Sequence, residues 1–292
     1  MRVAILSAKA ELHSTQRLVA AAKDRGLDPK VLSPLGCQLI LDTQEGPALY
    51  YQGQRQPAFA AVLPRVGHEL TLLGAMVLRH LQTQGSYSPT GASALLSARD
   101  KFHALQLLLA QGLPMPATAF GSDPEQIPLL MAQVGGAPLV IKVLEGSQGI
   151  GVSLADSPQA ARSTLEAFLG AKVNVLVQEF IGECAGQDLR LLVIGDKVVA
   201  AMARQAQQGD FRANLHCGGQ AQAVVPTPEE CAIAIKAAHT LGLGIAGVDL
   251  LRSHRGPLLL EVNSSPGIEG IEKATGLDIA GLMVDFVLAH CR

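Results

Sequence analysis

A chain of 292 residues that is 48% hydrophobic and 16% charged is long enough to bury a sizeable core and to divide into more than one domain. Its formal net charge of −2 gives no overall basic field to attract nucleic acid, and an aromatic content of 3%, without any Trp, disfavours a base-stacking surface. The five cysteines are scattered without a CxxC pair, and no apolar run is long enough to cross a membrane, which predicts a cytoplasmic protein with reduced thiols.

The first 96 residues alternate short apolar segments with helical ones. Residues 2–8 and 59–65 are predicted to be buried strands, and helices are expected after the first strand and around residues 69–81. This alternation predicts a small open α/β domain over residues 1–96. No GxGxxG follows the first strand, so the pattern does not indicate a dinucleotide-binding domain.

A different pattern begins near residue 97. A helix is predicted from residue 97 to Gly112, followed by strands and helices that end with a strand at residues 174–180. After Gly186 the chain favours hairpins, with DLRLLVI and KVVAAMARQA on either side of a GD turn. A helix with a T-x-x-E capping box then begins at Thr227.

The segment GVDLLRSHRGPLLLEVNSSPG, residues 247–267, predicts a hairpin with an acid on each strand. A three-residue turn at residues 254–256 puts Asp249 opposite Glu261, and Asn263 on the same face. Like charges that face each other destabilise a strand pair, so a cation is expected there, and oxygen donors of this kind suit Mg²⁺ or Mn²⁺. Neutralising both acids is accordingly expected to stabilise the metal-free protein. The alternative is the solvent-facing polar side of an edge strand.

Two lysines are candidates for phosphate contacts. Lys142 lies in the apolar strand PLVIKVL, where a buried lysine requires a partner. It precedes EGSQGIGV, residues 145–152, whose glycines allow backbone N–H groups to approach an anion, although no GK[ST] ends the loop. Lys101 stands near a helix N-terminus, which favours anions. A plain hairpin loop and a solvated surface lysine are the alternatives.

The loop GDFRANLHCGG, residues 209–219, carries further anion-binding candidates. Arg212 and Asn214 are suited to a phosphoryl or carboxylate group, because a guanidinium group binds such anions in a bidentate manner. Arg204, on the preceding strand, is a second possible phosphate contact.

Taken in order, the segments SARDK, IKVLEGSQGIGV, VQEFI, DLRLLVIGDKVVAA, GDFRANLHCGG, AGVDLL and LEVNSSPG resemble the ATP-grasp ligases, and within them the RimK family of glutamate ligases. The resemblance covers nearly the whole chain, and PRVG and EVNSSPGIEGIEKATG are specific to that family. It implies a fold of the α/β class, in which the ATP-grasp part is α+β. Residues 1–96 would form an N-terminal α/β domain, and residues 97–292 an ATP-grasp domain. Within the latter, a small lid at about 113–180 and a larger antiparallel core at about 181–292 would hold ATP between them.

The resemblance also implies roles for single residues. Asp249, Glu261 and Asn263 match the ligands of magnesium or manganese, of which two ions are expected. Arg212 and Asn214 match the catalytic loop that contacts ATP and the acyl phosphate. Arg65 of PRVG is the candidate contact for a substrate carboxylate, with a domain-interface ion pair as the alternative. The other matches to ATP-binding positions are Lys101, Lys142, Gln178, Glu179, Phe180, Ile181, Gly182, Asp188 and Arg204.

The implied reaction joins L-glutamate, through an acyl phosphate formed with ATP, to the C-terminal glutamate of a small-subunit ribosomal protein. A cytoplasmic homo-oligomer without nucleic-acid or membrane partners is expected. The alternatives are the same ligation on a small-molecule cofactor, free glutamate or an amino-acid carrier protein and, more remotely, a non-catalytic nucleotide-binding regulator. Gln205, Gln207 and Cys217 depart from the more basic residues that the family has there, and the expected consequence is either weaker binding of an acidic tail or a different acceptor.

Overall fold

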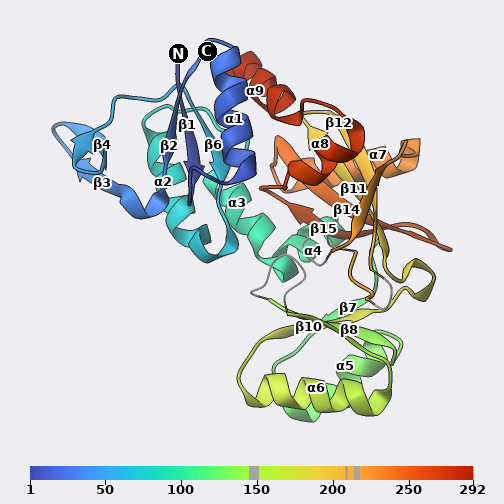
Figure 1. The fold of residues 1–292 in the computed structure, drawn as a ribbon. Helices are drawn as coiled ribbons and strands as arrows, with labels where there is room; N and C mark the ends of the chain where they lie inside the picture. The colour runs from blue at the N-terminus through green and yellow to red at the C-terminus, as the bar shows by residue number, and fades with distance from the viewer. Residues whose placement is uncertain (145–150, 208–209, 214–217, 292) are drawn as a thin grey trace.

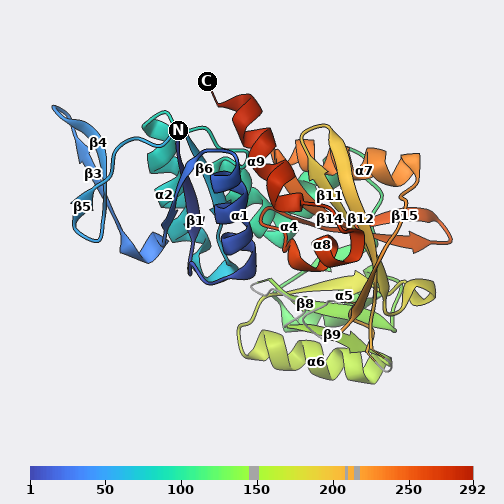
Figure 2. The ribbon, with the colours of Figure 1, turned by 45° about the horizontal axis from the view of Figure 1, so that its top comes forward.

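The computed structural model describes residues 1–291 except 145–150, 208–209 and 214–217, and it has three parts (Figure 1). The N-terminal part, in blue and teal, stands beside a large sheet drawn in yellow to red. A smaller green part lies below the large sheet, and Figure 2 shows the same arrangement after rotation. Among the described residues, no helix combines the length and the apolar character that crossing a membrane requires.

The N-terminal part contains an open parallel sheet, as predicted for an α/β domain. Its strands run in the order β2–β1–β6, with α1 and α2 packed beside them. Arg65 is the last residue of β6, at the carboxyl end of the sheet. The elements are β1 (Arg2–Ser7), α1 (His13–Asp24), β2 (Asp28–Leu32), η1 (Pro34–Gly36), β3 (Cys37–Asp42), β4 (Gly46–Tyr51), β5 (Gln54–Arg55), β6 (Ala61–Arg65), η2 (His68–Leu70) and α2 (Thr71–Thr83).

The antiparallel sheet β3–β4–β5 is absent from the sequence-based prediction. It projects from one side of the N-terminal part (Figure 2). Much of β3 faces solvent, and Leu41 is 82% exposed. A half-buried strand is recognised by alternating apolar and polar residues. In β3 apolar residues also face solvent, so the sequence lacks this alternation.

The single helix predicted between residue 97 and Gly112 is two helices, so that prediction is wrong in its boundaries. They are α3 (Ala92–Arg99) and α4 (Lys101–Ala110). The break lies at Asp100, whose extended backbone (ψ 100°) begins a new helix and whose carboxylate accepts a hydrogen bond from the backbone N–H of His103 at 3.0 Å. Since such a cap stabilises a helix start, the break leaves Arg99 and Lys101 on different helices.

The green part is a four-stranded sheet in the order β7–β10–β8–β9. On β8, Ile141 faces the helices α5 and α6 within the apolar core, so its neighbour Lys142 faces the other side, toward the large sheet. The elements are β7 (Thr118–Phe120), η3 (Pro124–Gln126), α5 (Ile127–Gln133), β8 (Leu139–Val143), β9 (Val152–Ala155), α6 (Pro158–Gly170) and β10 (Val175–Glu179).

The large sheet has five antiparallel strands in the order β13–β12–β11–β14–β15, which confirms the predicted antiparallel core. One face packs on α7 and α4, and the other on α8, α9 and the N-terminal part. The capping box that starts α7 at Thr227 is confirmed. The elements are η4 (Gly182–Cys184), β11 (Gln187–Ile194), β12 (Lys197–Gln205), β13 (Gln220–Ala223), α7 (Pro228–Thr240), β14 (Ile245–Ser253), β15 (Gly256–Asn263), α8 (Glu269–Thr275) and α9 (Ile279–His290).

Candidate nucleotide and metal site

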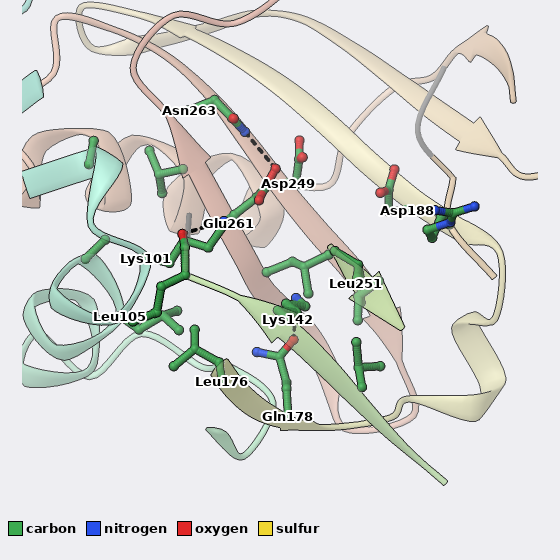
Figure 3. Close-up of a pocket in the computed structure, with 18 of the residues that line it drawn as sticks. Lys101, Leu105, Lys142, Leu176, Gln178, Asp188, Asp249, Leu251, Glu261 and Asn263 are labelled. Carbon is green, nitrogen blue, oxygen red and sulfur yellow. Dashed lines mark hydrogen bonds between the residues drawn. The ribbon is translucent and has the colours of Figure 1, made fainter. Parts of the chain in front are cut away.

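A cavity of about 890 Å³ lies between the small sheet and the large sheet (Figure 3). This is where the resemblance leads us to expect ATP. Gly182 begins η4 and does not line the cavity, and Asn214 lies outside the described residues. The predicted site residues that line it are Lys101, Lys142, Gln178, Glu179, Phe180, Ile181, Asp188, Arg204, Arg212, Asp249, Glu261 and Asn263.

The hairpin β14–β15 has the predicted pairing, but by a different route. Asp249 lies opposite Glu261, as expected. Ser253 pairs with Gly256, so the register leaves a two-residue turn, and Leu260 is an extra residue at a bulge. Gly256 has a φ of 96°, a left-handed conformation that glycine tolerates. The shorter turn and the bulge offset each other, because each moves the register by one residue in opposite directions.

Asp249 is held by two arginines. Arg190 donates to both of its carboxylate oxygens, at 2.7 and 2.6 Å, and Arg204 Nη2 donates to Oδ2 at 2.8 Å. Arg204 also forms a bidentate pair with Asp188, with both bonds at 2.6 Å. Burial alone would raise the pKa of Asp249, which is 1% exposed, but the two guanidinium groups outweigh burial and hold that pKa at about 2.

The four side chains Asp188, Arg190, Arg204 and Asp249 therefore form a buried cluster with two charges of each sign, which we call the acid–arginine cluster. The cation expected between the hairpin strands is thus supplied in part by the protein itself. Arg190 was missed by the sequence analysis. The signal was present, because Arg190 interrupts the apolar run of DLRLLVI in phase with Asp188.

Glu261 and Asn263 remain accessible from the cavity. The Glu261 side chain is 41% exposed, and its Oε1 accepts a hydrogen bond from Asn263 Nδ2 at 3.1 Å and lies 3.9 Å from Arg190 Nη2. The donor set is two carboxylates and an amide oxygen, and the described residues contain no cluster of three or more His, Cys, Asp or Glu suited to a metal. These hard donors fit Mg²⁺, which keeps several waters and requires few protein ligands.

Lys142 and Lys101 reach the cavity from different elements (Figure 3). Lys142 Nζ donates to Gln178 Oε1 at 2.7 Å, and Gln178 Nε2 donates in turn to Thr118 at 2.8 Å. Lys101 Nζ donates to the carbonyls of Leu144 and Val143, at 2.9 and 3.2 Å. Burial lowers the pKa of both lysines. Gln178 thus orients Lys142, and most of the predicted glycine-rich loop, residues 145–150, lies outside the described residues.

The other predicted contacts have internal partners. Glu179 Oε2 accepts hydrogen bonds from the backbone N–H of Ala117 at 3.1 Å and from Arg255 at 2.8 Å. Arg212 donates through Nη2 to Asp210 at 2.8 Å, and its backbone N–H donates to the same carboxylate at 2.9 Å. Asp210 therefore fixes the direction of the Arg212 side chain at the cavity wall.

Arg65 does not line the cavity. It is 9% exposed, and its Nη2 donates to the Pro266 carbonyl at 2.7 Å, which joins the N-terminal part to the loop after β15. The domain-interface ion pair considered as an alternative is not seen, since no carboxylate of the described residues pairs with Arg65.

Comparisons with known proteins agree with this arrangement. The family model described as RimK PreATP-grasp domain matches residues 1–95, and the family model described as RimK-like ATP-grasp domain matches residues 98–287. Over 287 residues, the chain is 51% identical to a probable alpha-L-glutamate ligase 1 of Shewanella amazonensis, covering 98% of this chain and 95% of that protein. It is 53% identical to a probable alpha-L-glutamate ligase 1 of Hahella chejuensis, with coverage of 98% and 94%.

Solved structures share the fold. The ATP-grasp ligase PsnB, complexed with a phosphomimetic variant of its minimal precursor, Mg and ADP, has a TM-score of 0.79 at 23% identity, covering 100% of this chain and 98% of that chain. A RimK domain ATP-grasp protein from Sphaerobacter thermophilus has a TM-score of 0.72 at 25% identity, with coverage of 99% and 100%. Because the two family matches span nearly the whole chain and relatives above half identity are present, the chain belongs to the RimK-like family of ATP-grasp ligases.

Proposed function

We propose that the protein joins L-glutamate to the C-terminal glutamate of a small-subunit ribosomal protein at the expense of ATP. The observation that carries the catalytic part is the convergence of Lys142, Glu261 and Asn263 on one cavity between the two sheets. The curated relatives named alpha-L-glutamate ligase support glutamate as the amino acid. PsnB, which was solved with a precursor peptide, supports a peptide as the acceptor.

In the proposed reaction, the γ-phosphoryl group of ATP passes to the acceptor carboxylate and leaves an acyl phosphate and ADP. The amino group of L-glutamate then attacks the acyl carbon, and phosphate leaves. Both first-step reactants are anions, so the site must neutralise them before they approach each other. Lys101 and Lys142 would contact the phosphates, and Arg212 would stabilise the negative charge that develops on the acyl oxygen and leaving phosphate.

Asp249, Glu261 and Asn263 would hold Mg²⁺, which supplies further neutralisation of the phosphate charge when bound. Glu261 and Asn263 are already adjacent, with their side chains hydrogen-bonded. Asp249 retains acceptor capacity, because its oxygens accept three of the roughly four bonds that a carboxylate can receive. The binding of two ions rather than one stays a prediction, as does a homo-oligomer.

The departures from the family pattern bear on the acceptor. Gln205 donates to the Gly186 carbonyl at 3.2 Å, Gln207 is exposed, and Cys217 lies outside the described residues. Uncharged side chains here reduce the positive charge available to an acidic tail. We therefore infer that this ligase binds its acceptor less through long-range charge than basic members of the family do.

Mass spectrometry of product tests the proposed function. Purified ribosomal proteins are incubated with the enzyme, ATP, Mg²⁺ and L-glutamate, and one small-subunit protein should gain a ladder of glutamate-sized additions at its C-terminus. ADP release that requires glutamate but leaves all ribosomal proteins unmodified would keep the ligase and reject this acceptor in favour of a small molecule or free glutamate. Neither modification nor ADP release would favour a nucleotide-binding regulator.

The binding of ADP should weaken as pH rises through the lowered pKa of Lys142. Burial favours the neutral amine in the free protein, whereas a phosphate favours the ammonium, so binding takes up a proton in this range. Calorimetry in buffers of different ionisation enthalpy measures that uptake. In Lys142→Arg, whose guanidinium group does not titrate here, most of the pH dependence should disappear; an unchanged pH profile would assign the effect to another group.

A further inference from the structure

Among the described residues, three buried side-chain polar atoms have no hydrogen-bond partner, and they belong to one region. They are Arg65 Nε, Arg99 Nε and Ser264 Oγ. Arg65 Nη2 donates to Pro266, two residues beyond Ser264, and Arg99 Nη2 donates to the carbonyl of Val66, which adjoins Arg65. Buried polar atoms are almost always paired. Three exceptions in one region therefore indicate that these atoms bind a ligand.

Neither guanidinium group has a carboxylate in direct contact among the described residues. Within the described part of the chain, the hydrogen bonds of Arg65 and Arg99 go to backbone carbonyls, and no carboxylate there forms an ion pair with either residue. By contrast, the buried Arg204 is paired with two carboxylates. Burial and the neighbouring charge of Arg99 lower the pKa of Arg65 to about 10, so the two cations lie close enough to repel. Such an arrangement is costly unless an anion joins it.

The position of these groups relates them to the reaction. Arg99 lines the cavity together with Glu261 and Asn263, and the charge of Glu261 acts on it. Arg65 stands at the carboxyl end of a parallel strand, the edge of an open α/β sheet at which ligands bind. Ser264 directly follows Asn263 at the end of β15. Of the three residues, Arg99 lines the cavity and Arg65 and Ser264 do not, so an anion would enter at Arg99, beside the proposed metal ligands, and would reach the other two only after a local side-chain shift.

We propose that Arg65, Arg99 and Ser264 bind a carboxylate group of a glutamate substrate, and that this carboxylate is not the one that reacts. The inference rests on the proposed function and adds Arg99 and Ser264 to it. A carboxylate accepts two parallel hydrogen bonds from a guanidinium group, and the Ser264 hydroxyl can donate a further one. This carboxylate belongs either to the incoming L-glutamate or to the C-terminal glutamate of the acceptor, and both present the same group to the site.

Binding measurements with two probes distinguish the sources. L-glutamate and a short peptide ending in glutamate are each titrated into the protein in the presence of Mg²⁺ and a non-hydrolysable ATP analogue, and ADP is titrated separately. In Arg99→Gln and in Ser264→Ala, affinity for at least one probe should fall tenfold or more, the effect of losing a hydrogen bond to a charged group. Loss confined to L-glutamate identifies the incoming amino acid, and loss confined to the peptide identifies the acceptor.

Two controls separate a specific loss of carboxylate binding from a local or general loss of structure. Ser265→Ala removes the neighbouring hydroxyl, which donates to the Pro64 carbonyl at 3.4 Å, and should leave both probe affinities unchanged. Ser264→Ala should not lower the melting temperature of the unliganded protein, because the Ser264 hydroxyl has no hydrogen-bond partner there. Arg99→Gln loses the bond to the Val66 carbonyl, so Ser264→Ala decides the test if Arg99→Gln is less stable.

Several outcomes would overturn the carboxylate site. These are unchanged affinity of both variants for both probes, an equal loss in Ser265→Ala, and a loss of ADP affinity as large as the loss of probe affinity. A wild-type protein that binds ADP but neither probe would also overturn it, while leaving the nucleotide part of the proposed function intact. Failure to bind ADP at all would instead reject the proposed function.

Discussion

Asp249→Asn should lower the free energy of unfolding by about 3–5 kcal/mol, whereas Glu261→Gln should change it by less than about 0.5 kcal/mol. Asp249 is buried, and its replacement leaves the acid–arginine cluster with one uncompensated positive charge. Glu261 is half exposed, so the loss of its amide hydrogen bond and of its solvent-screened attraction to Arg190, Arg99 and the two lysines should cost little. Urea denaturation in the presence of a chelator measures both changes without a contribution from metal.

Both substitutions should nevertheless abolish turnover, because each removes a proposed magnesium ligand. The two readouts therefore separate stability from catalysis at adjacent positions of one hairpin. Full turnover in Glu261→Gln would reject the metal assignment, and unchanged stability in Asp249→Asn would mean that the arginine pairs contribute nothing. For Asp249 this reverses the sign expected from the sequence, where two facing acids predicted that neutralisation would stabilise the metal-free protein.

The stability difference between wild type and Asp249→Asn should also depend on pH. The pKa of Asp249 in the folded protein, about 2, lies below the value of about 3.9 for an unfolded chain. Its contribution is therefore fully present above the unfolded value and is lost as pH falls through the folded value. The difference should be constant near neutrality and shrink as pH falls from about 4 toward 2.

Arg212→Ala should reduce kcat by about 10²–10³-fold, the usual effect of removing one donor to a developing oxyanion. The side chain lines the cavity and is directed by Asp210, so its contribution should appear in the transition state. Single-turnover measurements of ADP formation and of ligated product identify the affected step.

Asp210→Ala serves as the companion to this substitution, because it keeps the guanidinium group but removes the carboxylate that directs it. Its loss of kcat should be smaller than that of Arg212→Ala. A rise in the KM for ATP with unchanged kcat in Arg212→Ala would contradict the catalytic role and indicate ground-state binding instead.

The sequence predicted the strands and the acids more successfully than their partners. Asp249 and Glu261 are separated by an odd number of residues, so either a three-residue turn or a shorter turn with a bulge brings them opposite each other. The pairing was therefore robust to an error in the turn. In contrast, the partner of Asp249 on β12, Arg204, is far away in the sequence, and only the strand order β12–β11–β14 brings them together.

The same limit explains the other omissions. Arg99 and Ser264 became candidates only because their atoms are buried without partners, which no spacing in the sequence reveals. The helix break at Asp100 was overlooked because SARDK continues the helical pattern on both sides, and the decisive contact is a local cap. The exposed strand β3 was missed because its apolar residues do not mark a buried face.

The break at Asp100 has a consequence for the reaction geometry. Arg99 closes α3 and Lys101 opens α4, so a single residue separates the proposed substrate cation from the proposed phosphate cation. Two residue steps span at most about 7 Å along an extended chain. The distance between the backbone anchors of the two binding groups is thus set by covalent geometry rather than by packing. An inserted residue at this position would separate carboxylate and phosphate, even if each was still bound.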